Sequence, residues 1–483
     1  MKRVVIIGGG IAGLSAAWSL REHQLGVVRT GASEAQALEV VVLERHGSLG
    51  GNIKTEKTDG FLIEGGPDCF LSEKPWALAL CKRLGLEDEL LGTNEEKRKT
   101  FVLSNGRLHV LPEGVILMVP TKLLPFAASS LISIPGKIRM AMEFFIPKKK
   151  DDKDETLGSF VRRRLGQEAL DKIAEPLVAG VHAGDPATMS VRACFPKFVQ
   201  LEEEHGSLIR GMLKRLSAAK GAPTPPASAK KKITMFMTLK GGLSTLIDTL
   251  NERLLSSENT SIKTGVNVIG VHKKGAGYEA LAQDGSAIEA DVVVVAAPAW
   301  AASALLMALD DKLAEKLNAI PYVSTATVTI AFKRDAIRHP LNGFGFVVPK
   351  TEKRRIMAAT WTSVKFDYRS PDDAVLIRCF VGGSKNAELV SLSDAEMLGM
   401  VREELKDIMG IDAEPMLARV FRWFNSMPQY TVGHEERVAA IEALVSKHPG
   451  LYVTGSAYHG IGISDSVRNA EITAKKVLHL LAQ

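Results

Sequence analysis

The chain has 483 residues, more than a single hydrophobic core usually contains, so at least two domains are expected. Hydrophobic residues make up 46% and charged residues 24%, as in an ordinary globular enzyme, and a net charge of +6 over this length does not indicate a nucleic-acid partner. No apolar run approaches 20 residues, no signal peptide is recognised, and the four cysteines form no CxxC pair. We therefore expect no transmembrane helix, no metal site and a cytoplasmic protein with reduced thiols.

The N-terminus carries the pattern of a dinucleotide-binding turn. Residues 4–7 form a β-branched run that predicts a buried strand, and residues 14–21 predict a helix. The cofactor-binding residues predicted between them are Gly8, Gly9, Gly10, Ile11, Ala12 and Gly13. Gly8 would permit the tight turn, Gly10 the approach of a pyrophosphate, and Gly13 close packing of helix on strand. The phosphates would bind to backbone N–H groups at the positive end of the helix.

A second predicted strand, residues 40–43, ends in an acidic residue. Glu44 is placed to bind ribose hydroxyls, although it lies further from Gly13 than the usual spacing of about 20 residues. The extra length falls in residues 26–37, which are polar and rich in Gly and Ala and are predicted to be an inserted loop. With a strand, a helix and a strand ending in an acid around it, the glycine pattern is a fingerprint rather than a chance cluster.

Two segments that follow distinguish FAD from NAD. Residues 45–52 read RHGSLGGN and resemble the extended FAD signature of the glutathione-reductase-like flavoproteins. Residues 59–67 read DGFLIEGGP and resemble the strand and turn that lie beside the isoalloxazine in that superfamily. The resemblance implies FAD as cofactor and implies contacts from Arg45, Gly50, Gly51, Asn52, Gly65, Gly66, Pro67 and Asp68.

Later segments are expected to complete the flavin site. Residues 450–455 predict an apolar strand ending in glycine, and a glycine-rich turn precedes a C-terminal helix. Residues 240–243 precede a predicted helix at 244–255, Val266 and Val268 lie in a strand expected to pass the adenosine end, and residues 291–297 predict another buried strand. The further predicted cofactor contacts are Val268, Trp423, Gly455, Ile461, Gly462 and Ile463.

The middle of the chain has a different character. Between residues 110 and 215, apolar segments broken by prolines predict short helices, and residues 147–153 are highly charged. Two compatible interpretations carry equal weight: monotopic docking on a membrane, or a helical cap over an apolar active site. Residues 217–232 predict a flexible surface loop, and residues 325–332 and 374–382 predict strands of a substrate-domain sheet.

A family resemblance then covers nearly the whole chain, from residue 3 to the C-terminal helix. Residues 175–186, EPLVAGVHAGDP, resemble a segment of the protoporphyrinogen oxidases, and residues 157–166 are similar to that family's SFxxRRxG stretch. The resemblance implies an α/β fold with an FAD-binding Rossmann-like domain of the p-hydroxybenzoate-hydroxylase type (1–75, 233–300 and 425–483). It also implies an α+β substrate-binding domain (76–110 and 301–424) and an inserted α-helical, membrane-binding domain (111–216).

The implied activity is the oxygen-dependent six-electron oxidation of protoporphyrinogen IX to protoporphyrin IX in haem biosynthesis. FAD would take hydrides from the meso carbons, and dioxygen would reoxidise it to give hydrogen peroxide. A flat apolar macrocycle with propionates needs an apolar slot and cations at its mouth. The resemblance implies that Phe344 stacks on the macrocycle and that Gly180 and Val178 form the opposite wall. Thr325 and Arg98 complete the predicted substrate contacts, and no single catalytic residue is assigned.

Departures from the family pattern leave the substrate open. Several relatives have an arginine where this chain has Thr100, so Arg98 or a neighbouring lysine would hold a propionate. Asp68, beside the flavin turn, is expected to point away from a propionate. Coproporphyrinogen III, with four carboxylates, therefore stands as the alternative substrate. An amine oxidase, a carotenoid desaturase, or a flavin-containing scaffold without turnover are the rival functions. Peripheral contact with the cytoplasmic face of the membrane, and a homodimer, would be unremarkable for the family.

Overall fold

A parallel β-sheet forms the centre of the first structural unit. The computed structural model describes residues 1–30, 38–112, 115–116, 119–120, 123–220 and 233–483. The strands of this sheet, in spatial order, are β12 (Thr260–Thr264), β2 (Leu38–Glu44), β1 (Lys2–Ile7), β16 (Val292–Val295) and β22 (Leu451–Val453). All four pairings are parallel, so the carboxyl ends of the strands meet at one edge, where ligands of such sheets bind.

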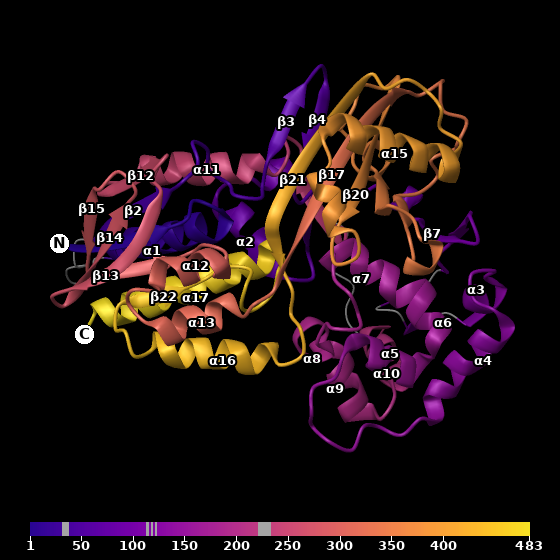
Figure 1. Ribbon diagram of the computed structural model, residues 1–483, viewed down its shortest axis with the longest axis horizontal. Coiled ribbons are helices and arrows are strands. Elements are labelled where there is room, and N and C mark those ends of the chain that lie inside the picture. The colour runs from indigo at the N-terminus through magenta and orange to yellow at the C-terminus, as the bar shows by residue number, and fades with distance from the viewer. Residues whose placement is uncertain (31–37, 113–114, 117–118, 121–122, 221–232) are drawn as a thin grey trace.

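Two layers cover this sheet because its side chains alternate between faces. Val4 and Ile6 pack in one apolar core with helices α1 (Ile11–Thr30), α2 (Pro75–Arg83), α11 (Ser244–Leu255) and α17 (Ile463–Leu481). Val5 and Ile7 pack on the other face in a second core. That core includes the antiparallel strands β13 (Val268–Lys274), β14 (Gly277–Ala282) and β15 (Ala287–Ala290) and the helices α12 (Ala299–Leu306), α13 (Asp311–Asn318) and α16 (His434–Val445). Figure 1 shows this layered half with both chain termini at its outer end.

A larger sheet forms the second unit. Its order is β21 (Leu417–Pro428), β17 (Tyr322–Lys333), β20 (Ala374–Gly382), β19 (Ile356–Trp361), β18 (Gly345–Val347), β7 (Thr100–Ser104) and β8 (Arg107–Val110). Helix α15 (Asp394–Met409) packs on it and begins with a capping box between Ser393 and Glu396. The hairpin of β3 (Thr55–Thr58) and β4 (Phe61–Glu64) lies beside β21 (Figure 1). A small sheet of β5 (Phe70–Leu71), β11 (Phe236–Leu239) and β6 (Leu90–Gly92) leads from the hairpin back to the first unit.

The third unit is helical and has its own apolar core. It contains α3 (Leu123–Ala128), α4 (Ile134–Ala141), a 3₁₀ turn η3 (Met142–Phe145), α5 (Leu157–Leu165), α6 (Gln167–Ala169), a π-helical turn η4 (Leu170–Ala174), α7 (Glu175–His182), α8 (Val191–Cys194), α9 (Pro196–His205) and α10 (Leu208–Lys220). An ion pair between Arg164 and Glu143 lies inside this unit with both side chains fully buried. Helix α7 joins this unit to the larger sheet (Figure 1). Within the described ranges, no helix has the length and apolar composition needed to cross a membrane.

Most predicted elements are confirmed, with four corrections. Helix α1 continues to Thr30, so residues 26–30 of the predicted insertion are helical, and residues 31–37 lie outside the described residues. Helix α10 likewise includes residues 217–220, and 221–232 lie outside the description. Residues 76–90 and 301–320, which we assigned to the substrate domain, instead contribute buried apolar side chains to the two cores of the first unit. The apolar faces of the helices in these two segments are compatible with the first unit and with the larger sheet alike. Only the tertiary packing decides on which of the two they lie.

Candidate functional site

The glycine turn after β1 has two kinds of glycine. An added Cβ at Gly13 would lie 1.9 Å from the carbonyl oxygen of Gly8, and one at Gly8 would lie 2.5 Å from the carbonyl oxygen of Ala296. These two positions therefore exclude a side chain because protein backbone occupies the space. At Gly10 the nearest atom is the Cα of Gly51, at 3.9 Å, so its open side faces a gap. The turn thus provides both the tight packing and the exposed backbone that a pyrophosphate requires.

Glu44 fastens the end of β2 to this turn. Its Oε2 accepts a hydrogen bond of 2.7 Å from the Gly9 N–H, and its Oε1 accepts one of 2.9 Å from the His46 N–H. The side chain is buried. Because each oxygen accepts one of these two bonds, each keeps a lone pair for a ligand at the edge of the sheet. The backbone N–H of Val266 also binds the Glu44 carbonyl oxygen, and β13 starts two residues later at Val268. Arg45 is exposed, with its guanidinium 5.8 Å from the Trp300 ring.

The second glycine pair lies against the first. The Gly50 N–H donates to the Gly9 carbonyl oxygen at 2.9 Å, and Gly51 has a φ of +59°. An added Cβ at Gly51 would lie 3.4 Å from the Cα of Gly10. At Gly66 an added Cβ would lie 1.7 Å from the carbonyl oxygen of Asn52. Backbone therefore packs on backbone where Gly51 meets Gly10 and where Gly66 meets Asn52.

Three strands of the larger sheet hold the flavin-side turn. The carbonyl oxygen of Gly65 accepts hydrogen bonds from Thr327 Oγ1 at 2.8 Å and Trp423 Nε1 at 2.9 Å. Arg378 Nη2 donates to the carbonyl oxygen of Gly66. These donors come from β17, β21 and β20, so the larger sheet and the turn at Gly65 and Gly66 form one hydrogen-bonded assembly. The carbonyl oxygens point towards the sheet, which leaves the other side of the turn available to a cofactor.

Buried charges surround the residue after this turn. Asp68 Oδ2 lies 2.9 Å from Lys365 Nζ, and the two side chains are 15% and 11% exposed. Burial alone would raise the pKa of Asp68, but the charges of Lys365 and Arg378 hold it well below its usual range. Burial raises the pKa of the neighbouring Glu64 carboxyl to about 7, against hydrogen bonds from the Leu243 N–H and from Thr55. Asp68 is therefore an anion turned towards Lys365.

The C-terminal segment closes the same edge of the sheet. Gly455 has a φ of +125°, and an added Cβ there would meet nothing within 4 Å. Tyr430 fixes the following turn, because its hydroxyl donates to the Ser456 carbonyl oxygen at 2.7 Å and accepts from the Gly460 N–H at 2.8 Å. Ile461 is half-buried, Gly462 is exposed, and α17 begins at Ile463. Because α17 follows parallel strand β22 as α1 follows β1, both helices begin at the carboxyl edge of the sheet.

These observations satisfy the requirements of FAD. An added Cβ at Gly10 would have no neighbour closer than 3.9 Å and one at Gly455 none within 4 Å, and a carboxylate lies at the end of β2. The residues predicted in the glycine segments and the C-terminal turn would hold the cofactor. Lys74 is a further cation beside the C-terminal turn, because its ammonium lies 2.6 Å from Asp465 in the first turn of α17. The sequence carried no signal for Lys74 because its partner lies at the far end of the chain.

The predicted substrate residues fall into two groups. Phe344 is half-buried at the start of β18, and an added Cβ at Gly180 would lie 3.5 Å from Val347 Cγ1 of the same strand. Helix α7 and β18 therefore lie in contact at this point. Thr325 lies on β17, half-buried and paired with Trp423. In the second group, Val178 lies on α7 with Gly180 and is 1% exposed within the helical core, and the Arg98 side chain is 62% exposed and paired with Glu95.

Several charged and polar side chains at the site were missed by the sequence reasoning. Lys365, Arg378 and Thr327 are separated from the flavin turn by hundreds of residues, and only strand register brings them to it. His182, two residues after Gly180, packs against the Phe195 ring at a centroid distance of 5.5 Å. Burial, assisted by the charge of Lys74, lowers the pKa of His182 to about 4, so the imidazole is neutral near pH 7.

Comparisons with known proteins agree with this geometry. The family of flavin containing amine oxidoreductases matches residues 11–478. A coproporphyrinogen III oxidase of Bacillus subtilis (strain 168) is 37% identical and is aligned over 99% of this chain and 98% of its own. Protoporphyrinogen oxidase 1 of Arabidopsis thaliana is 30% identical over 99% and 88%. A crystal structure from Exiguobacterium sp. 255-15, provisionally assigned as a protoporphyrinogen oxidase, superposes with a TM-score of 0.84 at 32% identity, covering 100% of this chain and 99% of its own.

Proposed function

The chain belongs to the family of flavin-containing amine oxidoreductases, its cofactor is FAD, and we propose that it oxidises a porphyrinogen to the porphyrin with dioxygen as electron acceptor. One observation carries this proposal: similarity to porphyrinogen oxidases extends over the whole chain, including the helical unit and the larger sheet. FAD, when bound, accepts the hydrogen removed from the substrate as hydride and passes the electrons to dioxygen, which gives hydrogen peroxide.

Coproporphyrinogen III is the substrate that we favour. The sequence led us to protoporphyrinogen IX, with coproporphyrinogen III as the alternative. The relative named for coproporphyrinogen is 37% identical, and the one named for protoporphyrinogen is 30% identical, which favours the alternative. Coproporphyrinogen III has four carboxylates and protoporphyrinogen IX has two. Cations outside the glycine segments and the C-terminal turn are therefore expected to discriminate between the two substrates. Protoporphyrinogen IX stays as the second candidate.

The protein's own side chains would orient the macrocycle and exclude water. We expect the macrocycle to lie between Phe344, which precedes β18, and Gly180 of α7, with an aromatic face on one side and a position without a side chain on the other. The neutral imidazole of His182 lies at the end of the same helix. Arg98 is exposed and is paired with Glu95 at 3.2 Å, so it would bind a propionate only at the surface of the protein.

Contact with a membrane surface is a further part of the proposal. Apolar side chains at every fourth position of α4 and η3 are exposed: Ile134 is 73% exposed, Ile138 59% and Met142 53%, and Phe145 after them is 79% exposed. A row of this kind on one face of a short helical segment is what an interfacial element presents to lipid. Three lysines, residues 148–150, follow it directly and would favour anionic lipids.

Anaerobic flavin reduction tests the activity. The purified yellow protein would be mixed without oxygen with coproporphyrinogen III and, separately, with protoporphyrinogen IX, while the flavin absorbance is followed. We expect rapid bleaching with coproporphyrinogen, slower bleaching with protoporphyrinogen, and porphyrin fluorescence once air is admitted. Flavin that stays oxidised with both would reject the proposal, and amine-dependent peroxide formation would replace it with an amine oxidase.

A further inference from the structure

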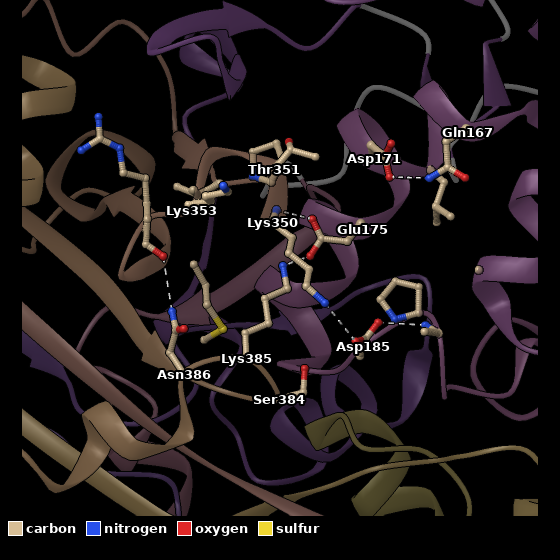
Figure 2. Close-up of a pocket in the computed structure, with 18 of the residues that line it drawn as sticks. Gln167, Asp171, Glu175, Asp185, Lys350, Thr351, Lys353, Ser384, Lys385 and Asn386 are labelled. Carbon is tan, nitrogen blue, oxygen red and sulfur yellow. Dashed lines mark hydrogen bonds and ion pairs between the residues drawn. The ribbon is translucent and has the colours of Figure 1, made fainter.

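A large cleft lies between the helical unit and the larger sheet. Its volume is about 920 Å³, which is within the range of sites for molecules of cofactor size. Helices α5, α6 and α7 and residues 185–187 form one side, and residues 348–357 and 384–386 form the other (Figure 2). Among the described residues that line it, none belongs to the glycine segments or the C-terminal turn that form the flavin-side cradle. The cleft is therefore a separate site.

Cations outnumber acids around this cleft. The cationic lining residues are Arg162, Lys350, Lys353, Arg354, Arg355 and Lys385, and the acidic ones are Asp171, Glu175 and Asp185. With six cations and three acids in the described lining, the cleft favours an anionic ligand.

Two of the arginines are held from outside the cleft. Arg355 Nε lies 2.9 Å from Glu404 Oε1, and Arg354 Nη1 lies 2.9 Å from Asp407 Oδ2. Both acids belong to α15, which packs behind the sheet and does not line the cleft. The acids of α15 therefore satisfy these arginines, and the positive charge available to a ligand comes from other residues.

Three exposed cations remain available. Lys350 Nζ approaches Asp185 Oδ2 only to 3.7 Å, and Arg162 Nε binds the uncharged Gln167 Oε1 at 2.7 Å. Lys353 forms no ion pair with any residue in the described part of the chain. Figure 2 shows Lys350 and Lys353 on the same side of the cleft, across from Asp171 and Gln167. An incoming carboxylate would meet these cations without displacing a strong ion pair.

A fourth cation is buried at the centre. Lys385 is 14% exposed and is ion-paired with Glu175, whose other carboxylate oxygen accepts a hydrogen bond of 2.9 Å from the Lys350 N–H. Burial lowers the pKa of Lys385 to about 8. A lysine ammonium has three N–H donors, so the pair with Glu175 leaves donors for a ligand. Apolar residues also line the cleft, among them Pro186, Val348, Pro349 and Met357, and together they form its apolar floor.

We propose that this cleft is a second binding site, distinct from the flavin-side cradle, for an amphiphilic polycarboxylate, and that its ligand is the carboxylate-bearing porphyrin that the reaction forms. The apolar floor matches the ring, and Arg162, Lys350, Lys353 and Lys385 match the carboxylates. The identity of the ligand rests on the proposed function, whereas recognition of a polycarboxylate rests on the cleft itself. Bound there, the product would leave the flavin side free for the next substrate molecule.

Equilibrium binding of coproporphyrin III to the FAD-loaded enzyme tests the proposal. The wild type is expected to bind two equivalents at low ionic strength, and the double variant Lys350→Gln/Lys353→Gln one equivalent at the same concentrations. Loss of two charge-assisted contacts should weaken the cleft site about tenfold or more. The matched control is Lys312→Gln/Lys316→Gln, which removes two charges from α13 in the first unit and should keep both equivalents. Turnover of porphyrinogen by the α13 control should stay within about twofold of the wild type.

The outcomes separate this inference from the proposed function. A single equivalent in the wild type, two equivalents in the cleft variant, or equal loss in the α13 control would each overturn the second site. Equal binding of coproporphyrin tetramethyl ester, which lacks the carboxylates, would overturn carboxylate recognition. If the wild type oxidises no porphyrinogen but still binds a second equivalent that the cleft variant loses, the proposed function fails and the polycarboxylate site stands.

Discussion

The indole Nε1 of Trp423 donates a hydrogen bond of 2.9 Å to the carbonyl oxygen of Gly65, although the two residues are 358 positions apart in the chain. Thr327 Oγ1 donates to the same oxygen at 2.8 Å. The flavin-side turn is thus held by the sheet that we assign to the substrate. A substitution in that sheet that removes one of these donors is therefore expected to weaken binding of the cofactor.

Replacing Trp423 should weaken FAD binding. Trp423→Phe keeps most of the packing but removes the donor to Gly65, and a hydrogen bond of this kind contributes about 0.5–1.5 kcal/mol. We expect the dissociation constant for FAD to rise about 2- to 10-fold, measured by flavin fluorescence during titration of the apoprotein. Trp361→Phe is the control, since its indole N–H has no partner among the described residues. It should lower thermal stability through a cavity and leave FAD affinity unchanged. Equal affinity for FAD in the Trp423 variant and the wild type would contradict the prediction.

Two glycines of the first turn should respond differently to alanine. Gly10→Ala adds a methyl group whose nearest neighbour is 3.9 Å away, so the protein should fold and melt like the wild type but purify without flavin. Gly13→Ala places the methyl group 1.9 Å from a backbone oxygen, so the first unit should be destabilised. Circular dichroism melting and the flavin absorbance of each variant separate the two effects. A yellow Gly10→Ala protein would show that the gap at this glycine is not where the phosphates bind.

The helical unit should depend on its internal ion pair. Arg164→Met leaves the fully buried Glu143 carboxylate without its ion-pair partner, and breaking such a pair costs about 3–5 kcal/mol. We expect a loss of that order in the free energy of unfolding, measured by urea titration followed by circular dichroism. Arg192→Met is the matched control, because its exposed guanidinium binds only the Asp152 carbonyl oxygen in the described structure. Similar unfolding curves for the two variants would show that the buried pair contributes no more than a surface contact.

Stability should fall in mild acid because of His434. Its ring is 2% exposed and stacks on Tyr430 at a centroid distance of 3.8 Å, and burial lowers the pKa of the imidazole from 6.5 to about 4. A depressed histidine pKa means that the unfolded chain binds the proton more tightly, so the contribution is complete above pH 6.5 and is lost as the pH falls towards 4. Between pH 7.5 and 4.5 this amounts to about 2–3 kcal/mol.

The variant His434→Gln should therefore show a weaker loss of stability over this pH interval. The measurement is the free energy of unfolding in urea at several pH values from 7.5 to 4.5. His272→Gln, at an exposed position on β13, should follow the wild-type profile. An unchanged pH profile in the His434 variant would assign the acid sensitivity to other groups, such as His182.

The exposed apolar row of the helical unit should determine membrane binding. Ile138→Glu/Phe145→Glu places two negative charges where these side chains are 59% and 79% exposed, so folding should be unaffected. We expect at least about a fivefold loss of co-sedimentation with vesicles that contain anionic lipid. The control Ile269→Glu/Met307→Glu changes two apolar residues of the first unit that are 49% and 53% exposed. If both double variants bind vesicles like the wild type, the row is not a lipid contact.

The sequence by itself determined the first strand, the glycine turn, the helix at 244–255 and both predicted strands of the larger sheet. These features depend on local properties, namely hydrophobic periodicity and the conformational freedom of glycine, so they can be predicted from neighbouring residues. The family resemblance likewise rested on contiguous segments, and the full-length comparisons confirmed it.

Only the tertiary structure decided which distant side chains complete the site. These side chains are the donors to Gly65 and Gly66, the partner of Asp68 and the cations of the cleft. They come from segments that are far apart in the chain, and nothing in the sequence indicates that these segments are in contact. It also decided that residues 76–90 and 301–320 pack with the first unit and that Arg98 lies exposed beside Glu95. The physical reason is that strand register and helix packing depend on the sum of many weak, non-local contacts, whereas the turn and strand signals are local.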